Sequence, residues 1–126
     1  MKKIFVSILA LFSLTICGCN FNTVDKGSLV VRNESENDSV YISAVYAMES
    51  EASGYQLVWT GKIENNSSEF IKLEPGKYAV KIEATNSFYE ILESKTAYET
   101  GYNIYKNLDS DGFINVVFDG KGVYFE

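Results

Sequence analysis

The sequence predicts an all-β protein, a small antiparallel β-sandwich of about seven to nine strands that follows an N-terminal signal helix. Three observations support this prediction. The chain has 126 residues, about one domain, and 46% of them are hydrophobic. Short segments with period-two alternation recur along the chain, and turns rich in Gly, Asn and Asp separate them.

The first 18 residues have the composition of a secretory signal peptide. Lys2 and Lys3 form a positive leader, and residues 4–16 are almost wholly apolar. At about 1.5 Å per helical residue, this apolar run spans about 20 Å, which is short of the ~30 Å hydrocarbon core of a bilayer. We therefore expect a secretory segment rather than a membrane span.

The segment Ile16-Cys17-Gly18-Cys19 resembles the lipobox of bacterial lipoproteins, in which a small residue precedes a cysteine that is diacylated and becomes the mature N-terminus. Cys19 follows Gly18, whereas Cys17 follows the bulky Ile16, so we predict lipidation at Cys19. An ordinary signal peptide with incidental cysteines is the alternative. The resemblance implies a signal peptide over 1–18 and a lipid-anchored tether over 19–26. The strand pattern described below predicts a β-sandwich domain over 27–126.

Cleavage before Cys19 has consequences for charge and location. It removes Cys17 and converts the Cys19 sulfur to a thioether, so the mature protein has no free thiol. It also removes Lys2 and Lys3, which leaves 9 basic against 17 acidic side chains, a net charge of −8. Because anionic headgroups repel such a domain, the acyl chains must hold it at the membrane. In the lipoproteins this segment resembles, an aspartate after the cysteine often means inner-membrane retention, so Asn20 favours the outer membrane.

Nine segments of the mature chain have the alternation and the β-branched or aromatic content of strands. In residues 40–48 the even positions, Tyr46 among them, suit a core face. In residues 55–63 the alternation places Trp59 toward the core with Leu57 and Ile63. Residues 90–100 fit a strand, a loop or one short helical turn. The nine expected strands cover residues 28–32, 40–48, 55–63, 70–73, 77–84, 88–92, 102–108, 113–118 and 123–125.

Turn chemistry agrees with a strand-rich fold. Pro75-Gly76, which contains the sole proline of the chain, fits a type II turn, so we expect Gly76 at positive φ. The four-residue segments 109–112 and 119–122 have the composition of hairpin turns.

Residues 71–82, Ile-Lys-Leu-Glu-Pro-Gly-Lys-Tyr-Ala-Val-Lys-Ile, resemble a hairpin of small bacterial envelope β-sandwiches, the PEGA-like and carboxypeptidase-regulatory-like domains. Residues 27–33 resemble the opening strand of the same modules. The resemblance covers about twenty residues. It implies a β-sandwich without catalytic activity.

Composition excludes several kinds of chemistry. The chain has no histidine, and its two cysteines lie within the first 19 residues, so we expect no His-based nucleophile system, no metal site and no cofactor. The acidic balance argues against nucleic acid as a partner. Asp109-Ser110-Asp111-Gly112 begins like a calcium loop, but Phe113 and Gly120 stand where that loop needs oxygen ligands. The glutamates show no pair set apart for hydrolysis, and we expect no catalytic residues.

The tyrosines are the remaining candidates for recognition. All nine lie beyond residue 18, and Tyr98, Tyr102 and Tyr105 cluster in the sequence. Tyrosine is common in strands for its β propensity alone, and exposed tyrosines also bind proteins or stack on sugar rings. We therefore expect a lipid-anchored cell-envelope protein with a binding or structural role and an envelope protein as its partner. A glycan-binding module that uses surface aromatics is the alternative, and a small carboxylate hydrolase is a weaker one.

Overall fold

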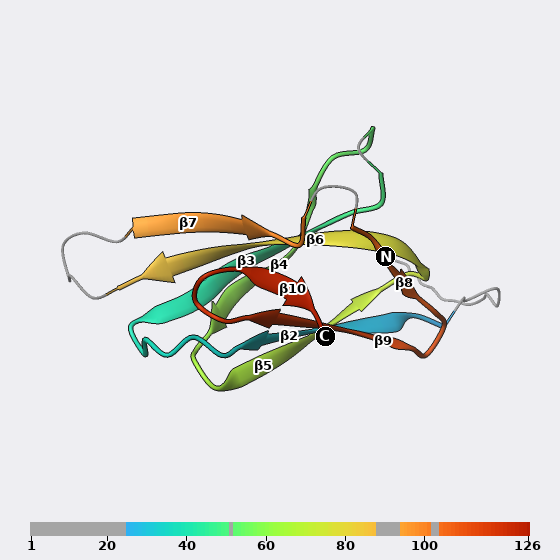
Figure 1. Ribbon diagram of the computed structural model, residues 1–126. Helices are drawn as coiled ribbons and strands as arrows, with labels where there is room; N and C mark the ends of the chain where they lie inside the picture. Colours follow the sequence, from blue (N-terminus) through green and yellow to red (C-terminus); the bar gives the residue numbers. More distant parts are fainter. Residues whose placement is uncertain (1–24, 51, 88–93, 102–103) are drawn as a thin grey trace, which may run out of the picture.

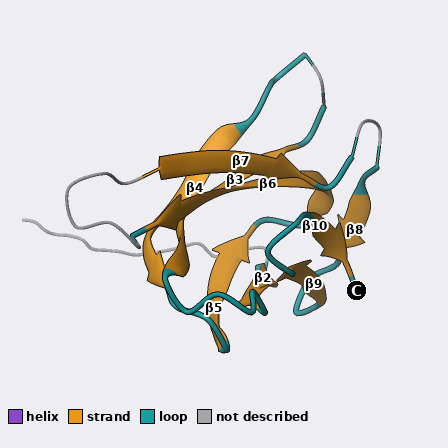
Figure 2. Ribbon diagram, turned by 60° about the vertical axis from the view of Figure 1, so that its left-hand side comes forward, coloured by secondary structure: helices purple, strands orange, loops and turns teal. Residues whose placement is uncertain are grey.

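The computed structural model describes residues 25–50, 52–87, 94–101 and 104–126, and these form an all-β sandwich of nine strands in two sheets (Figures 1 and 2). The expected signal helix, the lipidation site Cys19 and the strand expected over residues 88–92 lie outside the described residues. No helix in the described ranges is long and apolar enough to cross a bilayer.

Each sheet combines strands from distant parts of the chain. The first sheet has the order β10-β9-β2-β5, and the second has the order β4-β3-β6-β7, with the short β8 paired to β6. The bounds of the first sheet are Val123–Phe125 (β10), Phe113–Phe118 (β9), Gly27–Asn33 (β2) and Ser67–Leu73 (β5). Those of the second are Gln56–Ile63 (β4), Val40–Met48 (β3), Gly76–Asn86 (β6), Ser94–Glu99 (β7) and Lys106–Leu108 (β8).

One strand pair departs from the predicted antiparallel arrangement. β2 and β9 run parallel, with Leu29 opposite Ile114 and Val31 opposite Val116. The other pairs are antiparallel. The prediction was wrong here because alternation reports which face a strand buries and carries no information about the direction of its neighbour.

The core lies between the two sheets and consists of aliphatic side chains with few aromatic ones. Its members alternate along each strand, as a sheet with one buried face requires. The most deeply buried side chains include Leu29, Val31, Ile42, Val45, Val80, Ile82, Leu108, Ile114, Val116 and Phe118.

A β-bulge in β3 reverses part of the expected face assignment. The pairing of β3 shifts register between Ile42 and Ala44. The residues of β3 that face the core therefore have even numbers before the shift and odd numbers after it. Val45 and Ala47 are therefore buried, whereas Tyr46 is only half-buried and stacks under the Lys81 ammonium group. The expectation that Tyr46 shares the core face was wrong because one extra residue shifts every later side chain to the other face.

A second irregularity lies where β3 pairs with β4. The register shifts between Val45 opposite Trp59 and Tyr46 opposite Leu57, which leaves Val58 as the extra residue. Trp59 packs against the core and Ile63 is buried, as predicted, but Leu57 is 55% exposed, so its predicted core position was wrong. The bulge turns Leu57 outward because it breaks the alternation within β4.

The Pro75-Gly76 segment joins two sheets and is not a hairpin. β5 belongs to the first sheet and β6 to the second, so only Glu74 and Pro75 connect them across the sandwich. Gly76 is the first residue of β6 and has no positive φ, so the predicted type II turn was wrong. A Cβ at Gly76 would lie 3.1 Å from Oε2 of Glu49, which shows that this glycine allows a close side-chain approach.

The two aspartate-rich segments take different roles. Residues 119–122 form the predicted hairpin turn between β9 and β10, with Gly120 at φ 94°. Residues 109–112 also form a turn, closed by the amide of Gly112 donating to the carbonyl of Asp109 at 2.9 Å, but Asp111 takes the positive φ. This turn leads from β8, which pairs with β6, to β9 in the other sheet. The stretch expected over 90–100 as strand, loop or helix contains the strand β7.

Candidate binding surfaces

The structure does not bring the predicted tyrosines together on one face. Tyr98 is half-buried on the core side of β7, and its ring centroid lies 5.0 Å from that of Phe118. Tyr105 is also half-buried and lies near Tyr55, whose pKa it helps to raise. Tyr102 lies outside the described residues. Tyr98 is therefore part of the core, while Tyr105 belongs to a different cluster.

That cluster is a tyrosine–lysine face on the outer side of the β4-β3-β6-β7 sheet. One row of neighbouring residues crosses all four strands of this sheet. Tyr46 of β3 pairs with Leu57 of β4 on one side and with Lys81 of β6 on the other, and Lys81 pairs with Glu99 of β7. The Lys81 ammonium nitrogen lies 4.7 Å from the Tyr46 ring centroid and 5.0 Å from that of Tyr55. These are cation–π distances, so the lysine occupies the face of both rings.

Tyr55 reaches over this row from the segment before β4. Its hydroxyl donates a hydrogen bond to Oε1 of Glu99 at 3.2 Å, which links opposite edges of the sheet. Burial, then the Glu99 carboxylate, then Tyr105 raise the pKa of Tyr55 to about 12. The phenol is therefore neutral near pH 7 and acts as a hydrogen-bond donor. A second pair, the Lys62 ammonium group 4.7 Å from the Tyr41 ring centroid, extends the same pattern.

A groove of about 400 Å³ opens beside the outermost strands of the two sheets, β4 and β5. Its apolar lining comes from Ala47, Val58 and Leu73, which three different strands contribute. Charged groups of both signs also line it. The groove-lining ionic side chains are Lys26, Glu49, Lys72 and Glu74.

Tyr78 anchors the wall of this groove. It is 7% exposed, and its hydroxyl donates to the carbonyl of Glu74 at 2.6 Å, which holds the link between β5 and β6 in place. Burial is the largest cause that raises the pKa of Tyr78, and the carboxylates of Glu49 and Glu74 add to it. The phenol therefore stays protonated, and its hydrogen bond fixes the position of Glu74.

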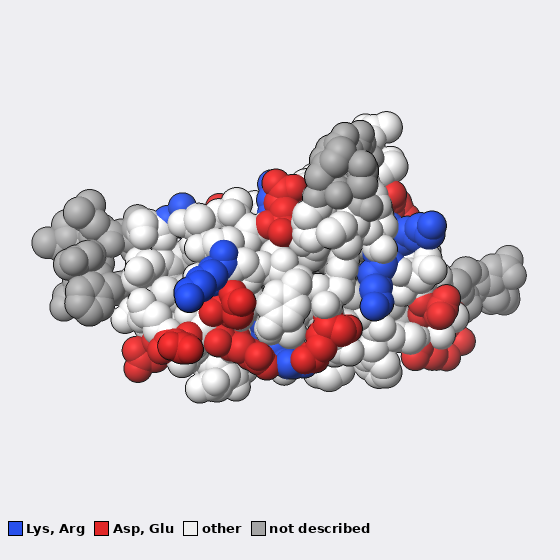
Figure 3. Space-filling view, in the orientation of Figure 1, with Lys and Arg blue, Asp and Glu red and all other residues white. Residues whose placement is uncertain are grey.

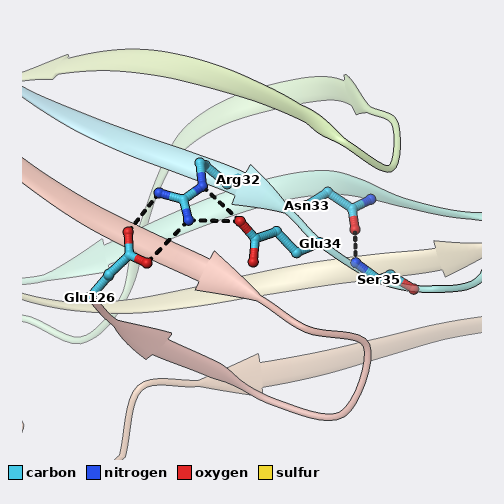
Figure 4. Close-up of polar contacts among 5 residues, drawn as sticks. All are labelled: Arg32, Asn33, Glu34, Ser35 and Glu126. Atoms are coloured by element: carbon cyan, nitrogen blue, oxygen red, sulfur yellow. Dashed lines mark hydrogen bonds and ion pairs between the residues drawn. The ribbon is translucent and has the colours of Figure 1, made fainter.

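Arg32 and two carboxylates form an ion-pair cluster on the surface. Arg32 on β2 donates to Glu126 at 2.7 and 3.2 Å and to Glu34 at 3.0 and 2.7 Å (Figure 4). The hydrogen bonds from Arg32 lower the pKa of Glu126 and, with Glu34, raise that of Arg32 itself. Both carboxylates hold the guanidinium group, so this cluster fastens residue 126 to β2 and leaves little capacity for a ligand.

A buried amide lies beside this cluster. Asn33 is fully buried, and its Nδ2 donates to the carbonyls of Val40 and Ile63, each at 3.0 Å. Its Oδ1 accepts from the amide of Ser35 at 3.0 Å (Figure 4). One side chain thus links the end of β2 to the beginning of β3 and the end of β4, and so joins the two sheets.

Acidic groups are spread widely over the surface. Figure 3 shows carboxylates along the lower half of one face, with only a few basic groups among them. Asp119 caps its own turn, since the amides of Lys121 and Gly122 donate to its Oδ1 at 2.8 and 2.9 Å and lower its pKa. Within the described residues, no three acidic or cysteine side chains gather closely enough to hold a metal ion.

No protein-family model, curated protein or solved structure matches this chain. The resemblances to the lipobox and to small envelope β-sandwiches therefore remain expectations drawn from the residues themselves.

Sequence reasoning missed both the groove and the tyrosine–lysine row. The alternation of residues 77–84 did place Lys81 on a polar face, which was the available signal for one member of the row. No comparable signal existed for the groove, because its residues come from strands whose neighbours the sequence does not reveal.

Proposed function

We propose that this chain is a lipid-anchored cell-envelope protein whose non-catalytic β-sandwich binds a protein partner in the groove beside β4 and β5. The main observation in support of a bound protein partner is the composition of the groove's lining. Apolar side chains are flanked there by Lys26 and Lys72 and by Glu49 and Glu74. An apolar centre with a polar, charged rim is the usual composition of a protein–protein interface.

The positions of β4 and β5 add support. In the part of the chain that the structure describes, each is the outermost strand of its sheet on this side of the sandwich. An outermost strand presents backbone groups that an extended polypeptide can pair with, and side-chain pockets then supply specificity. The groove thus lies beside two strands that are open to such pairing.

The tyrosine–lysine face argues against the glycan-binding alternative. A sugar ring stacks on an open aromatic face, but Lys81 covers Tyr46 and Tyr55, and Lys62 covers Tyr41. A glycan would have to displace these ammonium groups before it could stack.

A carboxylate hydrolase is the weakest alternative. Glu49 and Glu74 line the same groove, but Lys26 and Lys72 line it with them. A hydrolytic pair must keep one carboxyl group protonated while the other is ionised, which a groove containing two lysines opposes. Recognition of a partner with charges of both signs fits this composition better.

Site-specific photocrosslinking in intact cells tests the proposal. A photoreactive phenylalanine analogue replaces Gln56, an exposed residue that lines the groove, and a matched variant carries the analogue at Lys95, an exposed residue of β7. We expect one dominant protein adduct from position 56 and none from position 95. Charge reversal at Glu49 and Glu74 should then abolish the adduct.

Two results would contradict the binding proposal. Equal crosslinking at both positions would show that the groove is not the site. A saturable change of Trp59 fluorescence with a cell-wall oligosaccharide, together with loss of oligosaccharide binding by calorimetry in a folded Trp59→Ala variant, would favour the glycan-binding alternative.

A further inference from the structure

The outer face of the β10-β9-β2-β5 sheet carries an exposed aromatic pair. Phe70 of β5 is 58% exposed and Phe113 of β9 is 61% exposed, and their ring centroids lie 6.3 Å apart in an edge-to-face arrangement. β2 runs between these strands, with Val30 opposite Phe70 and Ser28 opposite Phe113. Ser28 and Val30 are buried although they lie on the outer face.

Two more apolar side chains lie farther along the same face, and Asn115 of β9 separates them from the pair. Val117 of β9 lies on the same outer face and is fully buried, and Tyr124, its partner on β10, is 45% exposed. Two exposed rings in contact have a different meaning from a single exposed hydrophobic residue, since exposed apolar patches mark interaction surfaces.

The chain enters the domain directly beside this pair. The carbonyl of Asp25 accepts a hydrogen bond from Oγ of Ser110 at 2.8 Å, and the amide of Ser28 donates to the carbonyl of Gly112 at 2.9 Å. These two bonds hold the beginning of β2 against the turn that immediately precedes Phe113. Asp25, the first residue that the structure describes, therefore lies beside the turn that precedes Phe113.

The length of the segment before Asp25 limits what can cover the rings. If Cys19 carries the acyl chains, five residues lie between it and Asp25, and at full extension the six Cα–Cα steps span about 20 Å. Asp25 is then held within about 20 Å of the anchored cysteine. A contact that is weak for a free domain becomes effective at the high local concentration that such a short tether imposes.

We infer that Phe70 and Phe113 insert into the headgroup region of the bilayer that holds the acyl anchor. The inference rests on the proposed lipid anchor. Aromatic rings favour the boundary between headgroups and acyl chains, where their apolar surface leaves water. The net charge of the chain is negative, and Asp109 and Asp111 lie in the turn before Phe113. An anionic surface would repel these groups, so the contact depends on apolar burial and suits a zwitterionic surface. The domain thereby rests with this sheet toward the membrane and its tyrosine–lysine face away from it.

Depth-dependent fluorescence quenching of the lipidated full-length protein tests the inference. The protein is reconstituted into phosphatidylcholine vesicles with brominated acyl chains, in a Trp59→Phe background. One variant then carries Phe113→Trp and the matched control carries Leu57→Trp, on the outer face of the other sheet. Both sites are more than half exposed, so the larger ring adds no buried volume. We expect several-fold stronger quenching at position 113 than at position 57.

The outcomes separate the anchor from the contact. Co-flotation of the protein with vesicles, lost in Cys19→Ser, reports the anchor alone. Flotation with equal or absent quenching at the two positions would overturn the inference and leave the anchor standing. Failure to float with intact lipid vesicles would contradict the anchor, and the contact with it. If Trp59→Phe does not fold, nitroxide labels on Phe113→Cys and Leu57→Cys give the same comparison by depth-sensitive spin resonance.

Discussion

At the scale of single residues, a buried amide has a larger structural effect than the ion pairs around it. Asn33 makes three hydrogen bonds to main-chain groups from three different segments, and no solvent reaches it. Arg32, by contrast, pairs with two partly exposed carboxylates. Loss of a buried hydrogen-bonding group leaves its partners unsatisfied, whereas exposed ion pairs retain water as an alternative partner.

Replacing this amide should therefore weaken the fold. Asn33→Ala leaves the carbonyls of Val40 and Ile63 and the amide of Ser35 without their partner, and we expect a loss of about 2 to 3 kcal/mol in the free energy of unfolding. Urea denaturation measures it. Asn107→Ala, at an exposed position of β8, is the matched control and should stay within about 0.5 kcal/mol of the native protein. Equal stability of the two variants would remove Asn33 as the link between the sheets.

The raised pKa of Tyr55 predicts how the free energy of unfolding responds to alkaline pH. Its pKa rises from 10.0 to about 12 in the folded protein, because burial and Glu99 disfavour the phenolate. The neutral phenol therefore stabilises the fold fully below pH 10, and this contribution is lost as the pH rises through about 12. We expect the free energy of unfolding to fall across this range, and to fall less in Tyr55→Phe.

Urea denaturation at successive pH values between about 9 and 12 measures this effect. Glu99→Gln keeps the shape of the side chain and removes its charge, so the pKa of Tyr55 should move back toward its ordinary value. An unchanged pH profile in both variants would contradict the proposed contact between Tyr55 and Glu99.

At the scale of secondary-structure elements, the bulges decide which side chains reach the core. Alternation correctly predicted most strands, the burial of Ile63 and the inward side of Trp59. It failed for Tyr46 and Leu57, which lie just beyond a register shift. A bulge depends on how two strands match each other, so the pattern of one strand alone does not reveal it.

The bulged strand β4 supplies a test through its glycine. A Cβ at Gly61 would lie 2.7 Å from Cζ2 of Trp59, so the indole rests directly on this glycine. Gly61→Ala should displace the ring, lower the free energy of unfolding by about 1–3 kcal/mol and shift the Trp59 emission to longer wavelength.

Gly122→Ala is the matched control, since a Cβ there meets nothing within 4 Å. Fluorescence is well suited to this comparison because Trp59 is the sole tryptophan of the chain. An unshifted emission in Gly61→Ala would show that the indole does not depend on this contact.

At the scale of the whole molecule, the proposed lipid anchor would determine how the domain meets its surroundings. Cys19→Ser should abolish incorporation of a labelled fatty acid and leave an unprocessed precursor, because the sulfur that forms the thioether is gone. Cys17→Ser should keep the label, since Gly18-Cys19 is intact. Metabolic labelling followed by immunoprecipitation distinguishes the two variants. Label that depends on Cys17 would overturn the predicted cleavage position.

The connections between sheets are also a property of the whole molecule. Pro75 and Gly76 looked like a hairpin turn in the sequence, yet they lie where the chain passes from one sheet to the other. A turn composition predicts that the chain changes direction, but it does not say which strand becomes the next neighbour. The resemblance to the hairpin of small envelope β-sandwiches is weakened at this point.

The sequence by itself determined the all-β class, most of the strands and the turn at residues 119–122, because alternation and turn preference are local properties. Only the tertiary structure decided the parallel pairing of β2 with β9, the outward positions of Tyr46 and Leu57, and the groove beside β4 and β5. These features depend on contacts between residues far apart in the chain. Their free energy comes from burying both sheets against one core, which no short segment encodes alone.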